Sequence, residues 1–160
     1  MEIKSVRVDI PEGMNVIIGQ SHFIKTVPDL YETLVASSPH LKFGIAFSEA
    51  SGHCLVRHEG NDEELERKAA DAAFCLACGH VFVIFLKDGF PINVLNAIKA
   101  CQEVCRVFCA TANPLEVIVA SSEQGNGVVG VIDGSRPKAI EDEEGRAWRI
   151  ELLRKFKYKL

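Results

Sequence analysis

Apolar residues recur along the chain with two spacings, one typical of strands and one typical of helices. Over residues 3–10 apolar and polar side chains alternate, which is typical of a strand with one exposed face. Turn residues follow at 11–13, and the apolar run at 15–20 is therefore expected to be the hairpin partner of the first strand. The same criteria predict further strands at residues 41–47, 54–57, 80–87, 104–109, 117–120 and 128–132.

Helical spacing of apolar residues marks four other segments. A capped start at residues 26–29 opens the first predicted helix, and the polar run at 61–64 caps the second, which Gly79 should end. Pro91 suits the first turn of a third helix. Residues 141–155 are rich in charge, so we expect the fourth helix to be peripheral.

The order of these elements predicts the fold class. Residues 81–86 are apolar on both faces, which suits a central strand covered on both sides. The alternation of strands and helices predicts an α/β fold with helices packed on the faces of a sheet, and hairpins at both ends would make that sheet mixed. No repeat, low-complexity tract or linker divides residues 1–160, so we expect a single domain.

Composition narrows the functional classes. A net charge of -4 with no basic run argues against nucleic acid as a partner. The longest apolar stretch, residues 81–86, is far shorter than the roughly 20 residues that cross a bilayer, so we expect no membrane association. The first residues contain no apolar signal-peptide core, and we therefore expect the protein in the cytoplasm.

Polar residues cluster just after three predicted strands, at residues 20–22, 48–51 and 111–113. In α/β sheets, ligands tend to bind in the crevice outside strand ends. We therefore expect these three segments to converge on one pocket. The alternative is that they are ordinary turn residues.

Several longer blocks of sequence resemble the signature segments of the adenosine-specific kinases. The resemblance covers nearly the whole chain and includes QSHFIKT at 20–26, KFGIAF at 42–47, FPINVLN at 90–96, ATANP at 110–114 and GVIDG at 130–134. It implies a small α/β protein that is a homotrimer, binds adenosine or AMP, and carries phosphate on a histidine.

Residue roles follow from this resemblance together with the local chemistry. His22 has a neighbouring hydroxyl and lysine, and a neutral imidazole is nucleophilic, so we assign it as the phosphoryl carrier. Lys25 would neutralise the phosphoryl oxygens, and Glu49 would act as the base that orients the adenosine 5'-hydroxyl. The substrate-binding residues are expected to be Ser21, Ser48, Ser51, Thr111 and Asn113. Mg²⁺ with a donor such as ATP is the expected cofactor.

Other motifs leave alternatives open. His80 opens the predicted central strand and is interpreted as a structural histidine, with a carrier role as the alternative. Cys75, Cys78 and His80 could suggest zinc, but no fourth ligand is apparent, so no structural metal is expected. The glycines of residues 125–130 match G-x-G-x-x-G, yet a strand follows them, which indicates a hairpin turn.

The chain contains no P-loop motif, G-x-x-x-x-G-K-[ST]. The lack of any known ATP motif favours a competing hypothesis for the function. In that hypothesis the protein is a nucleoside-binding or sensing module that recognises adenosine or AMP without turnover.

Overall fold

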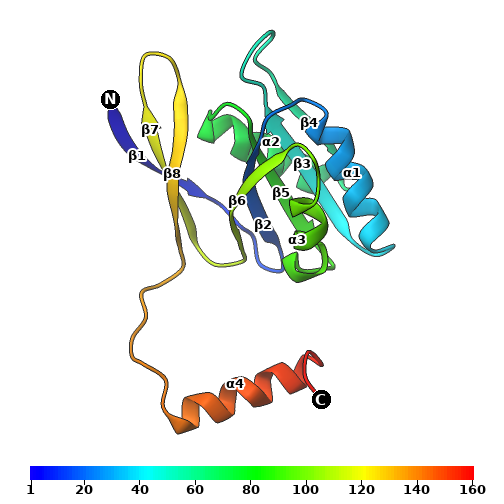
Figure 1. Ribbon diagram of the computed structural model, residues 1–160, viewed down its shortest axis with the longest axis vertical. Coiled ribbons are helices and arrows are strands. Elements are labelled where there is room, and N and C mark those ends of the chain that lie inside the picture. The colour runs from blue at the N-terminus through cyan, green and yellow to red at the C-terminus, as the bar shows by residue number, and fades with distance from the viewer.

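The computed structural model describes residues 1–160, and it has eight strands and four helices (Figure 1). In chain order they are β1 (Glu2–Val8), β2 (Asn15–Ser21), α1 (Thr26–Ser37), β3 (Lys42–Ser48), β4 (Val56–Gly60), α2 (Glu63–Leu76), β5 (Val81–Lys87), α3 (Pro91–Lys99), β6 (Val104–Thr111), β7 (Leu115–Ser121), β8 (Asn126–Asp133) and α4 (Glu143–Lys155). None of the helices combines the length and apolar character needed to span a bilayer.

The α/β class with helices on the sheet faces is confirmed, but the strands form two sheets. The larger sheet has the order β4-β3-β5-β2-β6 and the smaller has the order β1-β7-β8. Every pairing between these strands is antiparallel. The predicted central strand β5 does lie in the middle of the larger sheet, and its residues 81–86 are buried.

The predicted hairpin between the first two strands is wrong. β1 pairs with β7 in the smaller sheet, whereas β2 pairs with β5 on one side and β6 on the other. Residues 15–19 of β2 are all buried, so β2 needs a neighbour on both edges and cover on both faces. β1 is mostly exposed, which suits the edge position that its alternating pattern indicates.

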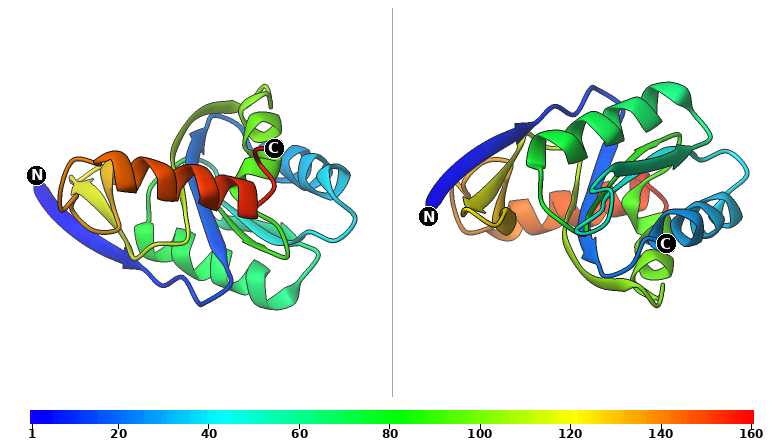
Figure 2. Two further views of the ribbon diagram at one scale, coloured as in Figure 1. Left: turned by 90° about the horizontal axis from the view of Figure 1, so that it is seen from below. Right: turned by 90° about the horizontal axis from the view of Figure 1, so that it is seen from above.

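Two apolar cores lie on the two faces of the larger sheet. One face, which includes Phe43, Phe47 and Phe82, packs against α1 and α3. The other face, which includes Val83 and Phe85, is covered by α2 and by the smaller sheet. Figure 2 shows α2 on the side of the larger sheet opposite to α1 and α3.

The C-terminal helix differs from the rest of the molecule. α4 has no buried residue, and in Figure 1 it stands apart from the sheets at the end of an irregular segment, residues 134–142. Its peripheral position is therefore confirmed. Only the residues after α4 return to the body, at the start of α3 and the end of β6.

Candidate functional site

Two of the three predicted polar segments meet at one edge of the larger sheet. β2 and β3 both run antiparallel to β5, so the ends of β2 and β3 flank the start of β5. The backbone N–H of Ser21 donates to the carbonyl oxygen of His80 at 3.0 Å, and the N–H of His80 donates to the carbonyl oxygen of Ser48 at 2.7 Å. We call this region, which contains Ser21, His22, Ser48, Glu49 and His80, the histidine edge.

The two histidines of this edge have different surroundings. His22 is exposed in the loop between β2 and α1, its ring is stacked beside Phe23 with centroids 6.3 Å apart, and neither ring nitrogen forms a hydrogen bond within the chain. His80 is half-buried and stacks on Phe47 at 5.7 Å, with a left-handed backbone at φ 63°. A non-glycine residue rarely adopts that conformation, which fits the interpretation of His80 as a structural histidine held by its neighbours.

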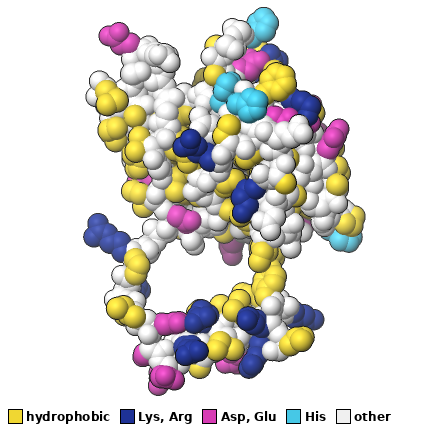
Figure 3. Space-filling model, in the orientation of Figure 1, with side chains coloured by type: hydrophobic (Ala, Val, Ile, Leu, Met, Phe, Trp, Pro, Cys, Tyr) yellow, Lys and Arg dark blue, Asp and Glu magenta, His cyan; other side chains and the backbone are white.

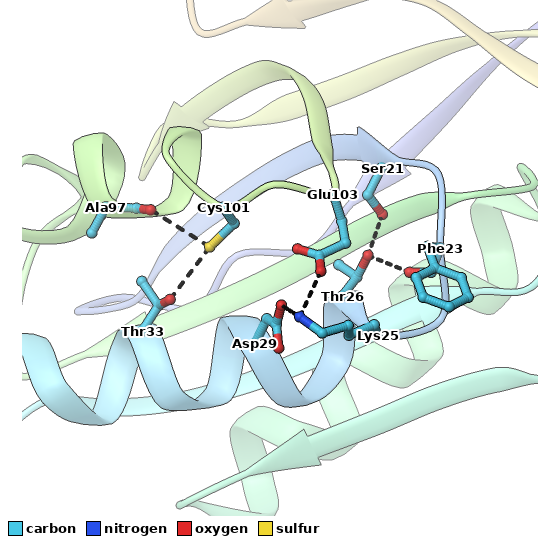
Figure 4. A network of polar contacts seen from close by, with 9 residues as sticks. All are labelled: Ser21, Phe23, Lys25, Thr26, Asp29, Thr33, Ala97, Cys101 and Glu103. Atoms are coloured by element: carbon cyan, nitrogen blue, oxygen red, sulfur yellow. Dashed lines mark hydrogen bonds and ion pairs between the residues drawn. The ribbon is translucent and has the colours of Figure 1, made fainter.

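The start of α1 surrounds Ser21 and Lys25 with polar groups (Figure 4). The hydroxyl of Thr26 lies 2.8 Å from Ser21 Oγ and 2.5 Å from the carbonyl oxygen of Phe23. The hydroxyl of Ser48, which was also predicted to bind substrate, is buried and has no partner within the chain. Hydroxyls from β2, β3 and α1 therefore lie at the same end of the sheet.

Lys25 is already engaged by two carboxylates. Its ammonium contacts Asp29 one turn along α1 and lies 3.1 Å from Glu103, which is buried just before β6 (Figure 4). The hydrogen bond to Asp29, followed by the one to Glu103, raises the pKa of Lys25, and Lys25 in turn lowers the pKa of Asp29. An ammonium has three N–H donors, so Lys25 could contact a phosphoryl group while it stays beside the two carboxylates, which already offset its charge.

Sequence reasoning missed both of these partners. The contact with Asp29 could have been predicted, because a lysine and an acid four residues apart on a helix commonly form an ion pair. Glu103 is 78 positions from Lys25, so no local spacing could indicate the contact. One carboxylate oxygen of Glu103, Oε2, is buried without a partner.

Glu49 follows β3 directly and is held by its own loop. Its carboxylate accepts a hydrogen bond from the backbone N–H of Leu55 at 2.8 Å and pairs with Arg57 at 3.0 Å. The Leu55 N–H and then Arg57 lower the pKa of Glu49, so the group stays ionised at neutral pH. Ser51, four residues before Leu55, is exposed, and its carbonyl oxygen accepts from Cys54 N–H at 3.3 Å.

A cavity of about 500 Å³ opens beside Glu49. The turn at Ala77–Gly79 and the β7–β8 hairpin tip at 121–127 line its other sides. This volume is within the range of small-molecule sites. In the glycine motif of residues 125–130, Gly125 ends the turn of this hairpin and residues 126–130 belong to β8, so a strand follows the turn as predicted.

The third predicted segment lies at the opposite edge of the larger sheet. Because β6 is antiparallel to β2, its last residue, Thr111, pairs with Val16 at the start of β2 rather than with Ser21. The five steps along the strand from Val16 to Ser21 span about 17 Å at roughly 3.3 Å per residue. The predicted convergence of all three segments within one chain is therefore wrong.

Thr111 and Asn113 instead bind Asp133, at the end of β8. Thr111 Oγ1 donates to Asp133 at 2.7 Å, and Asn113 Nδ2 donates to the same carboxylate oxygen at 3.0 Å. The N–H of Asn113 also donates to Thr111 Oγ1 at 3.0 Å. Asp133 belongs to the segment GVIDG, which resembles a family signature. Its position directly after the last predicted strand, residues 128–132, could have identified it as a strand-end polar residue.

No group of three or more His, Cys, Asp or Glu side chains in the chain is arranged to hold a metal ion. Cys75 is exposed, whereas Cys78 is buried and its Sγ donates to the carbonyl oxygen of Leu76 at 3.2 Å. Burial raises the pKa of Cys78 to about 11, which disfavours the thiolate that zinc requires. The absence of a structural zinc remains a prediction.

Histidine side chains gather with acidic and basic side chains at the end of the molecule that carries the β3–β4 loop (Figure 3).

No curated protein sequence matches the chain. Among solved structures it is similar to the PH1918 protein from Pyrococcus horikoshii OT3, with 46% identity, a TM-score of 0.95, and coverage of 99% of this chain and 98% of that chain. The family model described as adenosine specific kinase matches residues 6–159, and the chain therefore belongs to the adenosine specific kinase family.

Proposed function

We propose that the protein binds adenosine or AMP and transfers a phosphoryl group to adenosine through a phosphohistidine on His22. The observation that carries this proposal is the imidazole of His22, exposed, without a hydrogen-bond partner in the chain, and four residues before the start of α1. A phosphate donor can reach such a ring. The family description supports the kinase activity.

The first step is attack on the donor by His22. A neutral ring nitrogen forms a bond to the terminal phosphorus, and the bond from phosphorus to the leaving oxygen breaks, so the nucleoside diphosphate departs with the electron pair. The new phosphoramidate carries negative charge. The positive end of the α1 dipole favours an anion, and Lys25, whose half-exposed ammonium lies beside Asp29 and Glu103, supplies a cation for the phosphate oxygens.

The second step returns the phosphoryl group to adenosine. The 5'-hydroxyl oxygen attacks phosphorus, the nitrogen–phosphorus bond breaks, and the hydroxyl proton passes to the carboxylate of Glu49. Because its pKa is lowered, Glu49 is ionised and available as an acceptor, and its main effect is to orient the hydroxyl. In this proposal Ser21, Ser48 and Ser51 provide hydrogen bonds to the ribose or phosphate.

Mg²⁺ would accompany the donor rather than reside in the protein. The two carboxylates beside Lys25, Asp29 and Glu103, are both paired with it, and no group of three metal-ligating side chains exists in the chain. In such enzymes, Mg²⁺ is commonly bound by the phosphate oxygens of the donor and by water molecules, with only one or two carboxylates from the protein. When bound, the ion would offset the charge of the transferring phosphate.

Incubation of the purified protein with labelled ATP and adenosine tests the activity. We expect labelled AMP to form and a phosphorylated protein to be detected before adenosine is added. We also expect adenosine and AMP to bind more tightly than ATP in calorimetry, because no P-loop cradles a triphosphate. Tighter binding of ATP would contradict the proposed specificity.

The second candidate function is a nucleoside-binding or sensing module without turnover. The observation in its favour is that Thr111 and Asn113 are separated from His22 by the length of β2. Saturable binding of adenosine with neither AMP formation nor protein phosphorylation would favour this module over the kinase.

We further propose that the protein is a homotrimer that acts in the cytoplasm. The family resemblance supports the trimer, and α4, which buries no residue against its own chain, offers a surface for another copy. A trimeric mass in light scattering at micromolar concentration is the expected result. A monomer under those conditions would reject the proposal.

A further inference from the structure

Arg57 is a cation beside the histidine edge, near the start of β4. It lies directly opposite Phe47 of β3, and residues opposite each other in an antiparallel pair point to the same face of the sheet. The ring of His80 stacks on Phe47, and α1 packs on that face. The side chain of Arg57 therefore belongs to the face of the edge that carries His80 and the start of α1.

The hydrogen-bonding capacity of Arg57 is only partly used within the chain. A guanidinium has five N–H donors. Nη2 of Arg57 lies 3.0 Å from the carboxylate of Glu49, whereas Nε is buried without a partner. An unsatisfied buried donor costs free energy, so an anion that accepts from Nε and a terminal nitrogen together would improve on this arrangement. The side chain is 38% exposed, which leaves a ligand access to the guanidinium.

The proposed transfer to adenosine brings two anions together beside Arg57. Glu49 orients the 5'-hydroxyl, whose oxygen becomes part of the phosphate ester, so the phosphate arrives next to the Glu49 carboxylate. Two negative charges at contact distance repel each other unless a cation lies between or beside them. Arg57 is the cation that contacts Glu49 directly.

Lys25 is poorly placed to supply this charge. It contacts Asp29 and Glu103, and Glu103 lies just before β6. Since β6 and β4 are the two outer strands of the larger sheet, Lys25 and Arg57 lie toward opposite sides of the histidine edge. The two cations therefore suit different stages, Lys25 the phosphohistidine and Arg57 the phosphate ester.

We propose that Arg57 binds the phosphate group of the nucleotide product and so distinguishes AMP from adenosine. Its planar fork of donors matches two phosphate oxygens, and one further N–H can stay on Glu49. When Glu49 accepts the hydroxyl proton it becomes neutral, and the charge of Arg57 is then available to the phosphate. This inference rests on the proposed function, because that function places the 5'-hydroxyl beside Glu49.

Calorimetry of the full chain with AMP and with adenosine tests the inference without any turnover. For Arg57→Gln we expect AMP affinity to fall by about tenfold or more, because charge-assisted hydrogen bonds are lost, and adenosine affinity to fall much less. Arg57→Lys keeps the charge but not the fork, so its loss of AMP affinity should be intermediate. Arg67→Gln is the matched control, because Arg67 is exposed on α2, which covers the other face of the larger sheet.

The outcomes separate this inference from the proposed kinase activity. Equal losses of AMP and adenosine affinity in Arg57→Gln would overturn the inference, since Arg57 would then support the shape of the site rather than the phosphate. Unchanged AMP affinity in Arg57→Gln, or a wild type that binds no AMP, would also overturn it. Should Arg57→Gln fail to fold, Arg57→Lys decides by the same comparison. A wild type that binds AMP through Arg57 yet is never phosphorylated by ATP would refute the kinase alone.

Discussion

The histidine edge lies at the end of β2, and a cavity lined by residues that include Asn15, Phe90 and Tyr158 lies at its start, yet the two regions are built from different kinds of side chain. At the end of β2, hydroxyls, imidazoles and paired charges surround Ser21. At its start, Asn15 lies among apolar and aromatic side chains without a charge. The first arrangement suits handling of a phosphoryl group, whereas the second offers no charged side chain to one.

The two ends of β2 can differ in this way because the side chains at strand ends are less constrained than those in the middle of the strand. Polar residues at strand ends are free of the sheet's own packing demands, whereas residues 16–18 of β2 are fully buried and fixed. At the histidine edge Lys25 faces two acids, so an incoming phosphate meets Asp29 and Glu103 beside the same ammonium. The cavity at the start of β2 contains no such charges.

The largest effect is expected from His22→Asn. This change removes the proposed nucleophile while the loop can stay intact, so incorporation of phosphate from ATP should be lost completely. Mass spectrometry of the intact protein after exposure to ATP measures it. His40→Asn, at another exposed histidine, is the matched control and should retain phosphate.

His80→Asn tests the alternative that His80, rather than His22, carries the phosphoryl group. We expect it to retain phosphate, because the ring of His80 is stacked on Phe47 and half-buried. Retention in His22→Asn together with loss in His80→Asn would transfer the carrier role to His80 and move the reactive centre of the histidine edge to the start of β5.

Glu49→Gln should reduce turnover by about a hundredfold while weakening adenosine binding much less, since an orienting base matters most in the transition state. Steady-state kinetics and calorimetry on the same protein compare the two losses. Losses of equal size would argue that Glu49 only contacts the substrate.

The same variant has an expected pH signature. The pKa of Glu49 is lowered in the folded protein, chiefly by the Leu55 N–H and then by Arg57. Its stabilisation is therefore present above the unfolded-state pKa and is lost as the pH falls through the lowered folded-state pKa. Denaturant unfolding between neutral and acid pH should show a smaller acid loss in Glu49→Gln than in the wild type. An unchanged acid loss would contradict this account.

Gly19→Ala should disturb both ends of β2 by destabilising the strand that joins them. An added Cβ would lie 2.3 Å from Phe82 Cζ and 2.6 Å from the carbonyl oxygen of Arg106. The overpacking should cost about 1–3 kcal/mol in urea unfolding. Gly127→Ala is the control, because a Cβ there meets no atom within 4 Å. Equal stabilities of the two variants would show that β2 adapts without cost.

How far the sequence predicts these two regions depends on the range of the contacts involved. Periodicity located the strands and helices, and the apolar run at 81–86 correctly indicated the central strand. It could not choose partners for β1 and β2, because a turn after β1 suits a hairpin whether or not the strands pair. The burial of β2 on both faces was the overlooked signal.

The site was predictable to a similar extent. Strand-end polarity correctly indicated that Ser21 and Ser48 lie at the same end of the sheet, since that depends only on strand direction. The contact of Lys25 with Glu103, and the return of Tyr158 to the body, join residues far apart in the chain. Such contacts are decided by tertiary packing, and no local spacing encodes them.

We expect the smallest effect from Thr111→Val. This variant also tests whether the residues beside the start of β2 act within the chain rather than on the ligand. Valine keeps the shape of the buried side chain but removes the hydroxyl that donates to Asp133 at 2.7 Å, so stability should fall by about 1 kcal/mol. Adenosine affinity should change little, because that hydroxyl is used within the chain. Asp133→Ala removes the oxygen that accepts from both Thr111 and Asn113, and the double variant should cost less than the sum, since both changes break the hydrogen bond of Thr111. Strict additivity, or a tenfold loss of adenosine affinity in Thr111→Val, would instead assign the hydroxyl to the ligand.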